Sequence, residues 1–298
     1  MSWEETFKSW GAAPGTTEQQ KMENAETAIR KAINANTRLA SMDISIIKQG
    51  SYRSRTNVKQ DSDVDICVCL NSTFFPEYPA GKTDEHYGNA DGSINFSDFR
   101  DLVHEALDDY FGSENITPGN KAFDIHSNSY RVDADVVAAF AHRRYYGEGS
   151  DDYQQPTGIA FLTRNESKKI INWPDQVYEN GKNKHNSTGE RFRKMVRIVK
   201  KLRNKMQEER MAVANDIGSF LIESMIWNAP DDHFNRLTYK DDVRAVLAYC
   251  FNETLPAGKH GELGEVNDLK YLFHSNQPWT REQSHNFFSA AWDYLELK

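Results

Sequence analysis

The stretch QGSYRSRTNVKQDSDVDICVCL, residues 49–70, constrains the fold of this chain more than any other. It places Gly50 and Ser51, a polar segment and the run D-S-D-V-D ahead of an apolar, β-branched segment that predicts a buried strand. Side chains alternate along a strand, so Asp63 and Asp65 share one face while Val64, Ile66, Val68 and Leu70 take the other. Two carboxylates that approach each other repel unless a cation lies between them, so this pattern favours a metal site.

A third carboxylate comes from the later segment YRVDADVVAAF, in which Asp133 and Asp135 again share one face of a predicted strand. If this strand lies beside the first, three aspartates converge and can hold two metal ions about 3.5–4 Å apart. Mg²⁺ is commonly held by one or two carboxylates together with substrate phosphates. A turn at Gly50 and Ser51 adds backbone N–H groups and a hydroxyl near such phosphates. The conjunction predicts a nucleotidyltransferase site that uses two Mg²⁺ or Mn²⁺ ions.

Composition narrows the class of protein. The 298 residues are 38% hydrophobic and 27% charged, which is typical of a globular chain, and the length predicts about two domains. The three cysteines form no CxxC pair, so a zinc site or a disulfide framework is not expected. The start of the chain does not resemble a signal peptide, and no apolar run is long enough to span a membrane. We therefore expect a cytoplasmic protein with no membrane partner.

The net charge of −8 argues against double-stranded DNA as an activator, because proteins that grip duplex phosphates are more often basic. Residues 191–205 are the exception, since this segment is rich in Lys and Arg and contains no acid. It indicates either a local anion site, such as one for a triphosphate, or a solvated helix face.

Hydrophobic periodicity predicts strands mixed with helices in the first half of the chain and helices almost throughout the second. Helices are expected at 16–42, 96–112, 188–211, 216–228, 239–252, 265–273 and 280–296. Strands are expected at 43–51, 64–70, 121–127, 130–140, 158–163 and 168–173. The segment 71–93 is expected to be a long loop, either a lid or mobile surface.

The predicted fold class is an α/β (α+β) nucleotidyltransferase core with a mixed β-sheet, followed by an all-helical C-terminal lobe. The core, with its long N-terminal helix, is expected at 1–160 and the helical lobe at 161–298. We expect the active-site cleft to lie between the two.

The motif GSYRSRTN followed by DSDVDI is similar to the fingerprint of the polymerase-β-like nucleotidyltransferases. Four further segments, VDADVVAAF, NSTGERFRKMVRIVKKLRN, IGSFLIESMIWNAP and EVNDLKYLF, extend the likeness over nearly the whole chain. Together they resemble the bacterial cyclic oligonucleotide synthases (CD-NTases) related to cyclic GMP-AMP synthase and oligoadenylate synthase. One departure is Arg55, because some relatives have a glycine near the end of the first motif.

The resemblance implies a catalytic triad that binds the metal ions. Asp63, Asp65 and Asp135 match its three positions. Asp133 is the rival for the third position, and Asp135 is preferred because the D-V-V sequence that begins there fits the pattern of the family.

The resemblance also implies the residues that bind the nucleotide. Gly50 and Ser51 match the turn that holds the phosphates, while Lys200 and Ser219 match residues that contact the triphosphate. Phe220 matches a residue that can stack on a base.

By resemblance, the enzyme joins NTPs, with purines such as ATP and GTP the expected donors, into a cyclic di- or trinucleotide messenger and releases pyrophosphate. The messenger would activate a separate effector in anti-phage defence, and a regulatory partner protein could control the enzyme. A linear polymerase or RNA-tailing enzyme would share the active site but would need an extended basic RNA track, and none is found outside 191–205. A catalytically dead nucleotide-binding protein would need a broken triad, whereas all three acids are present.

Overall fold

The computed structural model describes residues 2–58, 63–165, 168–255 and 262–297. The chain divides into two compact units. The sheet unit comprises Gly15–Tyr52 and Ser62–Asp175, and the helical unit comprises Met1–Pro14, Arg53–Asp61 and Gln176–Lys298. Across the described residues, no helix combines the length and the apolar character that crossing a bilayer requires.

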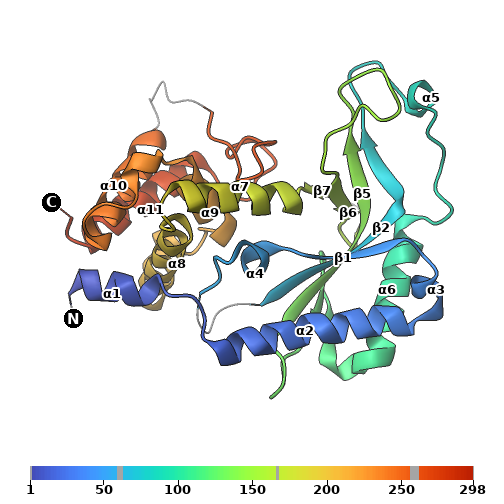
Figure 1. Cartoon of the computed structure of the whole chain (residues 1–298), viewed down its shortest axis with the longest axis horizontal. Helices are drawn as coiled ribbons and strands as arrows, with labels where there is room; N and C mark the ends of the chain where they lie inside the picture. Colours follow the sequence, from blue (N-terminus) through green and yellow to red (C-terminus); the bar gives the residue numbers. More distant parts are fainter. Residues whose placement is uncertain (1, 59–62, 166–167, 256–261, 298) are drawn as a thin grey trace. The chain divides into compact units, whose positions relative to one another are not determined.

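The sheet unit is built on a mixed sheet, in which the described residues form seven strands (Figure 1). The strands are β1 (Ile44–Lys48), β2 (Val64–Glu77), β3 (Ile116–Pro118), β4 (Phe123–Ile125), β5 (Ala134–Arg144), β6 (Gly158–Leu162) and β7 (Lys169–Asn172). The order is β1-β2-β5-β4-β3, with β6 pairing β5 and β7 pairing β6. β2 and β5 run parallel, whereas the other pairs are antiparallel. The predicted mixed sheet is confirmed.

Helices α2 (Thr16–Ala35) and α6 (Phe96–Phe111) pack on this sheet (Figure 1). The residues that α2 buries recur at helical spacing, as the sequence predicted; they are Met22, Ala25, Ile29, Ala32 and Ile33. They join the apolar side of β2 and β5 in one hydrophobic core. This core fixes the two central strands, on which the aspartates lie.

The predicted helix at 16–42 is interrupted at Asn36 and continues as the short α3 (Thr37–Ala40). Asn36 has an extended backbone, and its side chain accepts hydrogen bonds from the N–H groups of Arg38 and Leu39. Asparagine is a strong N-cap, so it starts a new helix here instead of continuing the old one.

The predicted loop at 71–93 is wrong over its first part, because β2 continues to Glu77. After a register shift between Leu70 and Phe74, residues 74–77 pair with residues 141–144 of β5. Phe75 contacts the rings of Phe96 and Phe140, so side-chain packing holds this part of the chain extended. The rest contains a short helix, α5 (Asp84–Tyr87), and its role as a lid stays a prediction.

The helical unit confirms the predicted helical second half. Its helices are α1 (Trp3–Trp10), α7 (Pro174–Ser187), α8 (Phe192–Glu208), α9 (Ser219–Asn228), α10 (Tyr239–Glu253) and α11 (Arg281–Tyr294). The expected packing stripe of α8 is buried in the core of this unit; it consists of Phe192, Met195, Val196, Val199, Leu202 and Met206. α1 adds Phe7 to the same core.

The predicted helix at 265–273 is wrong. The segment is irregular, with a β-bridge between Gly264 and Tyr271. Asn267 uses its own side-chain oxygen to accept a hydrogen bond from the N–H of Leu269, and Asp268 has a φ of 57°. Local side-chain bonding and a left-handed residue both oppose a helix, which the apolar spacing alone did not reveal.

The compact units also differ from the predicted boundary at residue 160. The β6–β7 hairpin extends the sheet to Asn172, so the chain leaves the sheet unit at Asp175. The first 14 residues belong to the helical unit rather than to the core, because Phe7 packs there. Both placements depend on contacts between remote segments, which have no signal in the sequence.

Replacing Phe7 by alanine should destabilise the helical unit by about 3–5 kcal/mol, because the ring is fully buried. Denaturant unfolding measures this change. The matched control is Leu237→Ala, which removes an apolar side chain that is 94% exposed and should change stability by less than about 0.5 kcal/mol. Equal effects of the two substitutions would show that α1 is not part of this core.

Candidate active site

The Gly50–Ser51 pair lies directly against the acidic strand. The N–H of Gln49 donates to the carbonyl of Asp65 at 2.9 Å, so the end of β1 is tied to the start of β2. Gly50 has a φ of 56°, and a Cβ at this position would collide with the Asp65 carboxylate. Glycine is therefore required both by the backbone and by the close approach. The predicted turn is the first turn of a short helix, α4 (Gly50–Ser54), in which Ser51 is half-buried.

Asp63 and Asp65 stand at the entry to β2. Asp63 is exposed and Asp65 is half-buried, while Val64 and Ile66 are fully buried in the core. This alternation is the one that the sequence predicted for a strand with one acidic and one apolar face.

Asp65 and Asp135 are direct partners in the parallel pairing of β2 with β5. Partners on adjacent strands project from the same face of a sheet, so the two carboxylates are neighbours. The three-aspartate prediction required the two strands to lie side by side, and they do. The catalytic roles themselves stay predictions.

Asp133 occupies a different environment from Asp135. One oxygen of the Asp133 carboxylate accepts a hydrogen bond from the N–H of Ser127 at 2.6 Å, and the Asp133 carbonyl accepts from the N–H of Val64 at 3.1 Å. Asp133 thus stabilises the connection between β4 and β5. This geometry favours Asp135 as the third member of the triad.

The electrostatics of this face favour a bound cation. Burial raises the pKa of Asp135, and the negative charges of Asp124, Asp63 and Asp133 raise it further. Asp124 is the antiparallel partner of Asp135 on β4, so Asp65, Asp135 and Asp124 form a row across three strands. Asp124 was not predicted from the sequence, because an exposed acid in a short strand has no pattern that separates it from an ordinary surface residue.

These residues fit the chemistry of Mg²⁺, although they do not form a closed cage. Among the residues that the structure describes, no three His, Cys, Asp or Glu side chains gather closely enough to hold an ion by themselves. Mg²⁺ usually binds one or two carboxylates and completes its octahedron with water and substrate phosphates. Carboxylate oxygens on neighbouring strands, beside the Gly50 turn, match that incomplete donor set.

Lys200 lies in the interior of the helical unit, with 2% of its surface exposed. Its ammonium donates to the carbonyl and the hydroxyl of Thr56, at 3.2 and 3.3 Å, and lies 3.7 Å from a carboxylate oxygen of Glu223. The Thr56 hydroxyl donates to the same oxygen at 2.8 Å. The structure therefore places Lys200 in a buried network, which the sequence analysis did not anticipate. Its contact with a triphosphate stays a prediction.

Ser219 is the first residue of α9, and Phe220 follows it. The Ser219 hydroxyl accepts a hydrogen bond from the Arg203 guanidinium at 3.3 Å, and Arg203 also donates to the carbonyl of Ile217 at 2.7 Å. Both Ser219 and Phe220 are half-buried, so each keeps surface that a ligand could contact.

The structure thus brings one group of predicted site residues together on the sheet unit; this group is Gly50, Ser51, Asp63, Asp65 and Asp135. The second group, Lys200, Ser219 and Phe220, belongs to the helical unit.

Comparisons with known proteins agree with this geometry. Residues 179–296 match the family model of the cGAS/DncV-like nucleotidyltransferase C-terminal helical domain. The chain is 40% identical to a cyclic dipyrimidine nucleotide synthase CdnE of Legionella pneumophila, over 99% of both chains. It is 31% identical to a cyclic dipurine nucleotide synthase of Elizabethkingia meningoseptica, over 98% of both chains.

Two solved structures share the fold over nearly the whole chain. The CdnE cyclic dinucleotide synthase of Elizabethkingia meningoseptica, solved with GTP and Apcpp, superposes with a TM-score of 0.81, at 30% identity and 98% coverage of each chain. The CdnE c-UMP-AMP synthase of Rhodothermus marinus, solved with Apcpp and Upnpp, gives 0.85 at 26% identity, with coverage of 98% of this chain and 96% of that one. The sheet with its aligned aspartates, the helical domain and these full-length relatives together show that this chain belongs to the CD-NTase family of cyclic nucleotide synthases.

Proposed function

We propose that this chain joins nucleoside triphosphates into a cyclic dinucleotide at divalent metal ions held by Asp63, Asp65 and Asp135. The observation that carries the proposal is the direct pairing of Asp65 with Asp135, beside a glycine turn that packs on the Asp65 carboxylate. Full-length relatives that are cyclic nucleotide synthases support the same reaction.

Each round of the reaction forms one phosphodiester bond. A ribose hydroxyl oxygen of one NTP loses its proton to water and bonds to the α-phosphorus of another NTP. The bond between that phosphorus and the oxygen that bridges it to the β-phosphorus breaks, and pyrophosphate leaves. When bound, Mg²⁺ or Mn²⁺ would lower the pKa of the hydroxyl and neutralise the triphosphate. Asp135, Asp65 and Asp63 would hold the ions, and the backbone at Gly50 and Ser51 would orient the phosphates. A second round between the ends of the linear product closes the ring.

The names of the relatives favour pyrimidine substrates over the purines that the sequence analysis expected. Two relatives, which share 40% and 35% identity with this chain over 99% of its length, are both cyclic dipyrimidine nucleotide synthases. The relative at 31% identity is a cyclic dipurine nucleotide synthase. We therefore propose UTP and CTP as the preferred substrates. The anti-phage role, the effector and a regulatory partner stay predictions.

The test of this function is a product assay. The protein is incubated with Mg²⁺ or Mn²⁺ and the four NTPs, singly and in pairs, and the phosphatase-resistant products are identified by mass spectrometry. We expect a cyclic dinucleotide that contains uracil or cytosine. Only linear oligonucleotides would favour a tailing enzyme, and a purine-only product would overturn the substrate preference alone.

The double variant Asp63→Ala/Asp65→Ala should lower the yield of that product by about three orders of magnitude or more, the scale of losing an essential catalytic group. Its circular dichroism spectrum should match that of the unsubstituted protein, because both side chains lie outside the buried face of β2. Full activity with an intact fold would contradict the metal site.

Asp135→Asn and Asp133→Asn separate the two candidates for the third position, because each keeps its size and loses its charge. Asp135→Asn should abolish the product, since it removes a metal ligand. Asp133→Asn should lower activity less than about tenfold and should lower thermal stability, since the hydrogen bond from the N–H of Ser127 loses its charged acceptor. The reverse order of activities would assign the triad to Asp133.

A further inference from the structure

Arg55 has a backbone conformation that suits glycine. It follows α4, and its φ is 57°, in the left-handed region that side chains other than glycine seldom adopt. Its carbonyl accepts a hydrogen bond from the guanidinium of Arg197 at 2.6 Å, which holds the strained backbone in place. The Arg55 side chain is exposed. The backbone of Arg55 is thus fixed, while its exposed side chain is accessible to a ligand.

Arg193 is a buried cation without a partner in the described part of the chain. It is the second residue of α8, and only 9% of its surface is exposed. Its Nε is buried and makes no hydrogen bond, and its guanidinium makes no ion pair with a described residue. Buried charges are normally paired, because an isolated one is costly to remove from water.

The surroundings of Arg193 are strongly positive. Burial lowers the pKa of Arg193, and the charge of Arg55 lowers it further. Arg197 responds in the same way, since burial and then Arg193 lower its pKa to about 10. The positive end of the α8 dipole adds to this potential. Tyr178 and then Glu223 act in the opposite direction on the pKa of Arg193. One Glu223 oxygen binds Thr56 and Lys200, whereas the other is buried and makes no hydrogen bond in the described part of the chain.

The positive charge of Arg193 also affects the pKa of His185. Burial, followed by the charge of Arg193, lowers the pKa of His185 to about 4, so its ring is neutral at pH 7 although Glu190 acts in the opposite direction. The backbone N–H of Arg193 points to Nδ1 of this ring at 3.5 Å. The neutral ring therefore adds no charge of its own, and its second nitrogen can serve as a donor.

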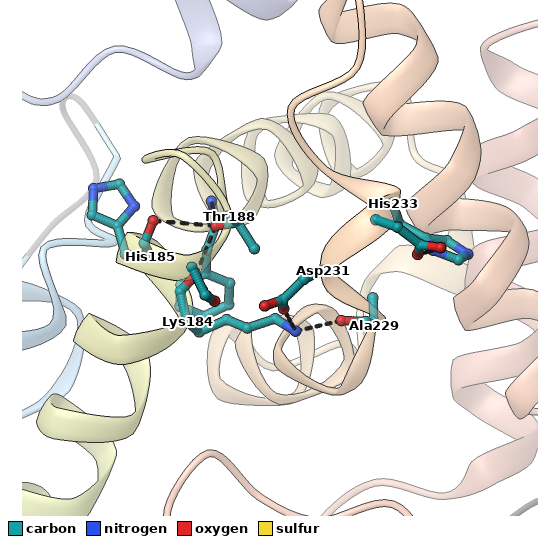
Figure 2. Close-up of polar contacts among 9 residues, drawn as sticks. Lys184, His185, Thr188, Ala229, Asp231 and His233 are labelled. Atoms are coloured by element: carbon teal, nitrogen blue, oxygen red, sulfur yellow. Dashed lines mark hydrogen bonds and ion pairs between the residues drawn. The ribbon is translucent and has the colours of Figure 1, made fainter.

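Several polar contacts join the corner between α7 and α8, which lies directly before Arg193 in the chain (Figure 2). The ammonium of Lys184 binds the Asp231 carboxylate at 2.6 Å and the carbonyl of Ala229. The Thr188 hydroxyl donates to the carbonyl of Lys184 at 2.7 Å and accepts from the N–H of Phe192 at 3.1 Å. The ring of His185 points away from the Lys184–Asp231 pair (Figure 2). Arg193 thus follows a corner that hydrogen bonds and an ion pair stabilise.

We propose that Arg55 and Arg193 form a binding site for a phosphate-bearing anion, specifically a diphosphate or triphosphate group, at the corner between α7 and α8. Guanidinium groups suit phosphate because their donors form a planar fork. An anion there would neutralise two like charges and satisfy the buried Arg193. The site is distinct from the predicted contact at Lys200, which lies seven residues along α8, about 10 Å by helical rise. Binding needs neither metal nor turnover, so the proposal does not depend on the proposed function.

Calorimetric titration with inorganic pyrophosphate, in a buffer containing EDTA and no nucleotide, tests this site. The unsubstituted protein should bind saturably, and Arg193→Met should raise the Kd at least tenfold. Arg55→Gly should raise the Kd to a similar extent without lowering the Tm, because glycine removes the backbone strain. If Arg193→Met does not fold, Arg55→Gly still tests the site. The matched control is Lys205→Met, which removes a charge that α8 pairs with Glu208 and Glu209 and should change the Kd less than twofold.

Absence of saturable binding, or an unchanged Kd in Arg55→Gly, would overturn the site. Repeating the titration with metal-free UTP and ATP identifies the source of the phosphate. If a nucleotide binds more tightly than pyrophosphate and its affinity depends on both arginines in the same way, the site is assigned to a nucleotide. If the nucleotide and pyrophosphate bind with equal affinity, the site is assigned to free pyrophosphate. Asp63→Ala/Asp65→Ala should keep the pyrophosphate affinity within about threefold, so failure of the synthase mechanism and failure of this site are told apart.

Discussion

The parallel pairing of β2 with β5 is the interaction on which the sheet unit depends. It aligns Asp65 with Asp135, and the same pairing buries the apolar side of both strands under α2 and α6. Because side chains alternate, one register sets both the core and the acidic face, and a slip of one residue would exchange them. A slipped register would expose Val64, Ile66 and Val136 to water, which is unfavourable. The burial of these side chains therefore keeps the carboxylates aligned. Stability and chemistry are specified by the same hydrogen bonds.

Several basic residues of α8 are buried and bind other parts of the chain instead of facing solvent. Arg197 donates to the carbonyls of Gly11 and Arg55, and Lys200 donates to Thr56, so these cations hold two distant segments of the chain against the helix. In the sequence, the segment was compatible with an anion site or a solvated face. The structure adds a third use, the hydrogen bonding of backbone carbonyls inside the helical unit. Arg193, which is buried and has no such partner among the described residues, is the basic residue of α8 that we propose to bind an anion.

What could be predicted from the sequence was local and periodic. The buried positions of α2 and α8 and the two faces of β2 follow from spacings of 3.6 and 2 residues, and the Gly50 turn follows from its chemistry. The predictions failed where distant partners decide the outcome. Residues 74–77 form a strand because they pair with β5. Residues 265–273 are irregular because the side-chain hydrogen bond of Asn267 and the left-handed backbone of Asp268 oppose a helix. Neither the partners of Lys200 nor the row that includes Asp124 has a signal in the sequence, since both depend on pairings between remote segments.

The most direct test of the central claim is a crystal structure with Mn²⁺ and a non-hydrolysable UTP analogue, in which anomalous scattering locates the metal. We predict Mn²⁺ bonded to carboxylate oxygens of both Asp65 and Asp135 at about 2.0–2.6 Å, the range for hard cations with oxygen ligands, and to the phosphates of the analogue. Mn²⁺ bound to the phosphates but to neither aspartate, or to Asp133 in place of Asp135, would contradict the assignment of these paired strands as the metal site.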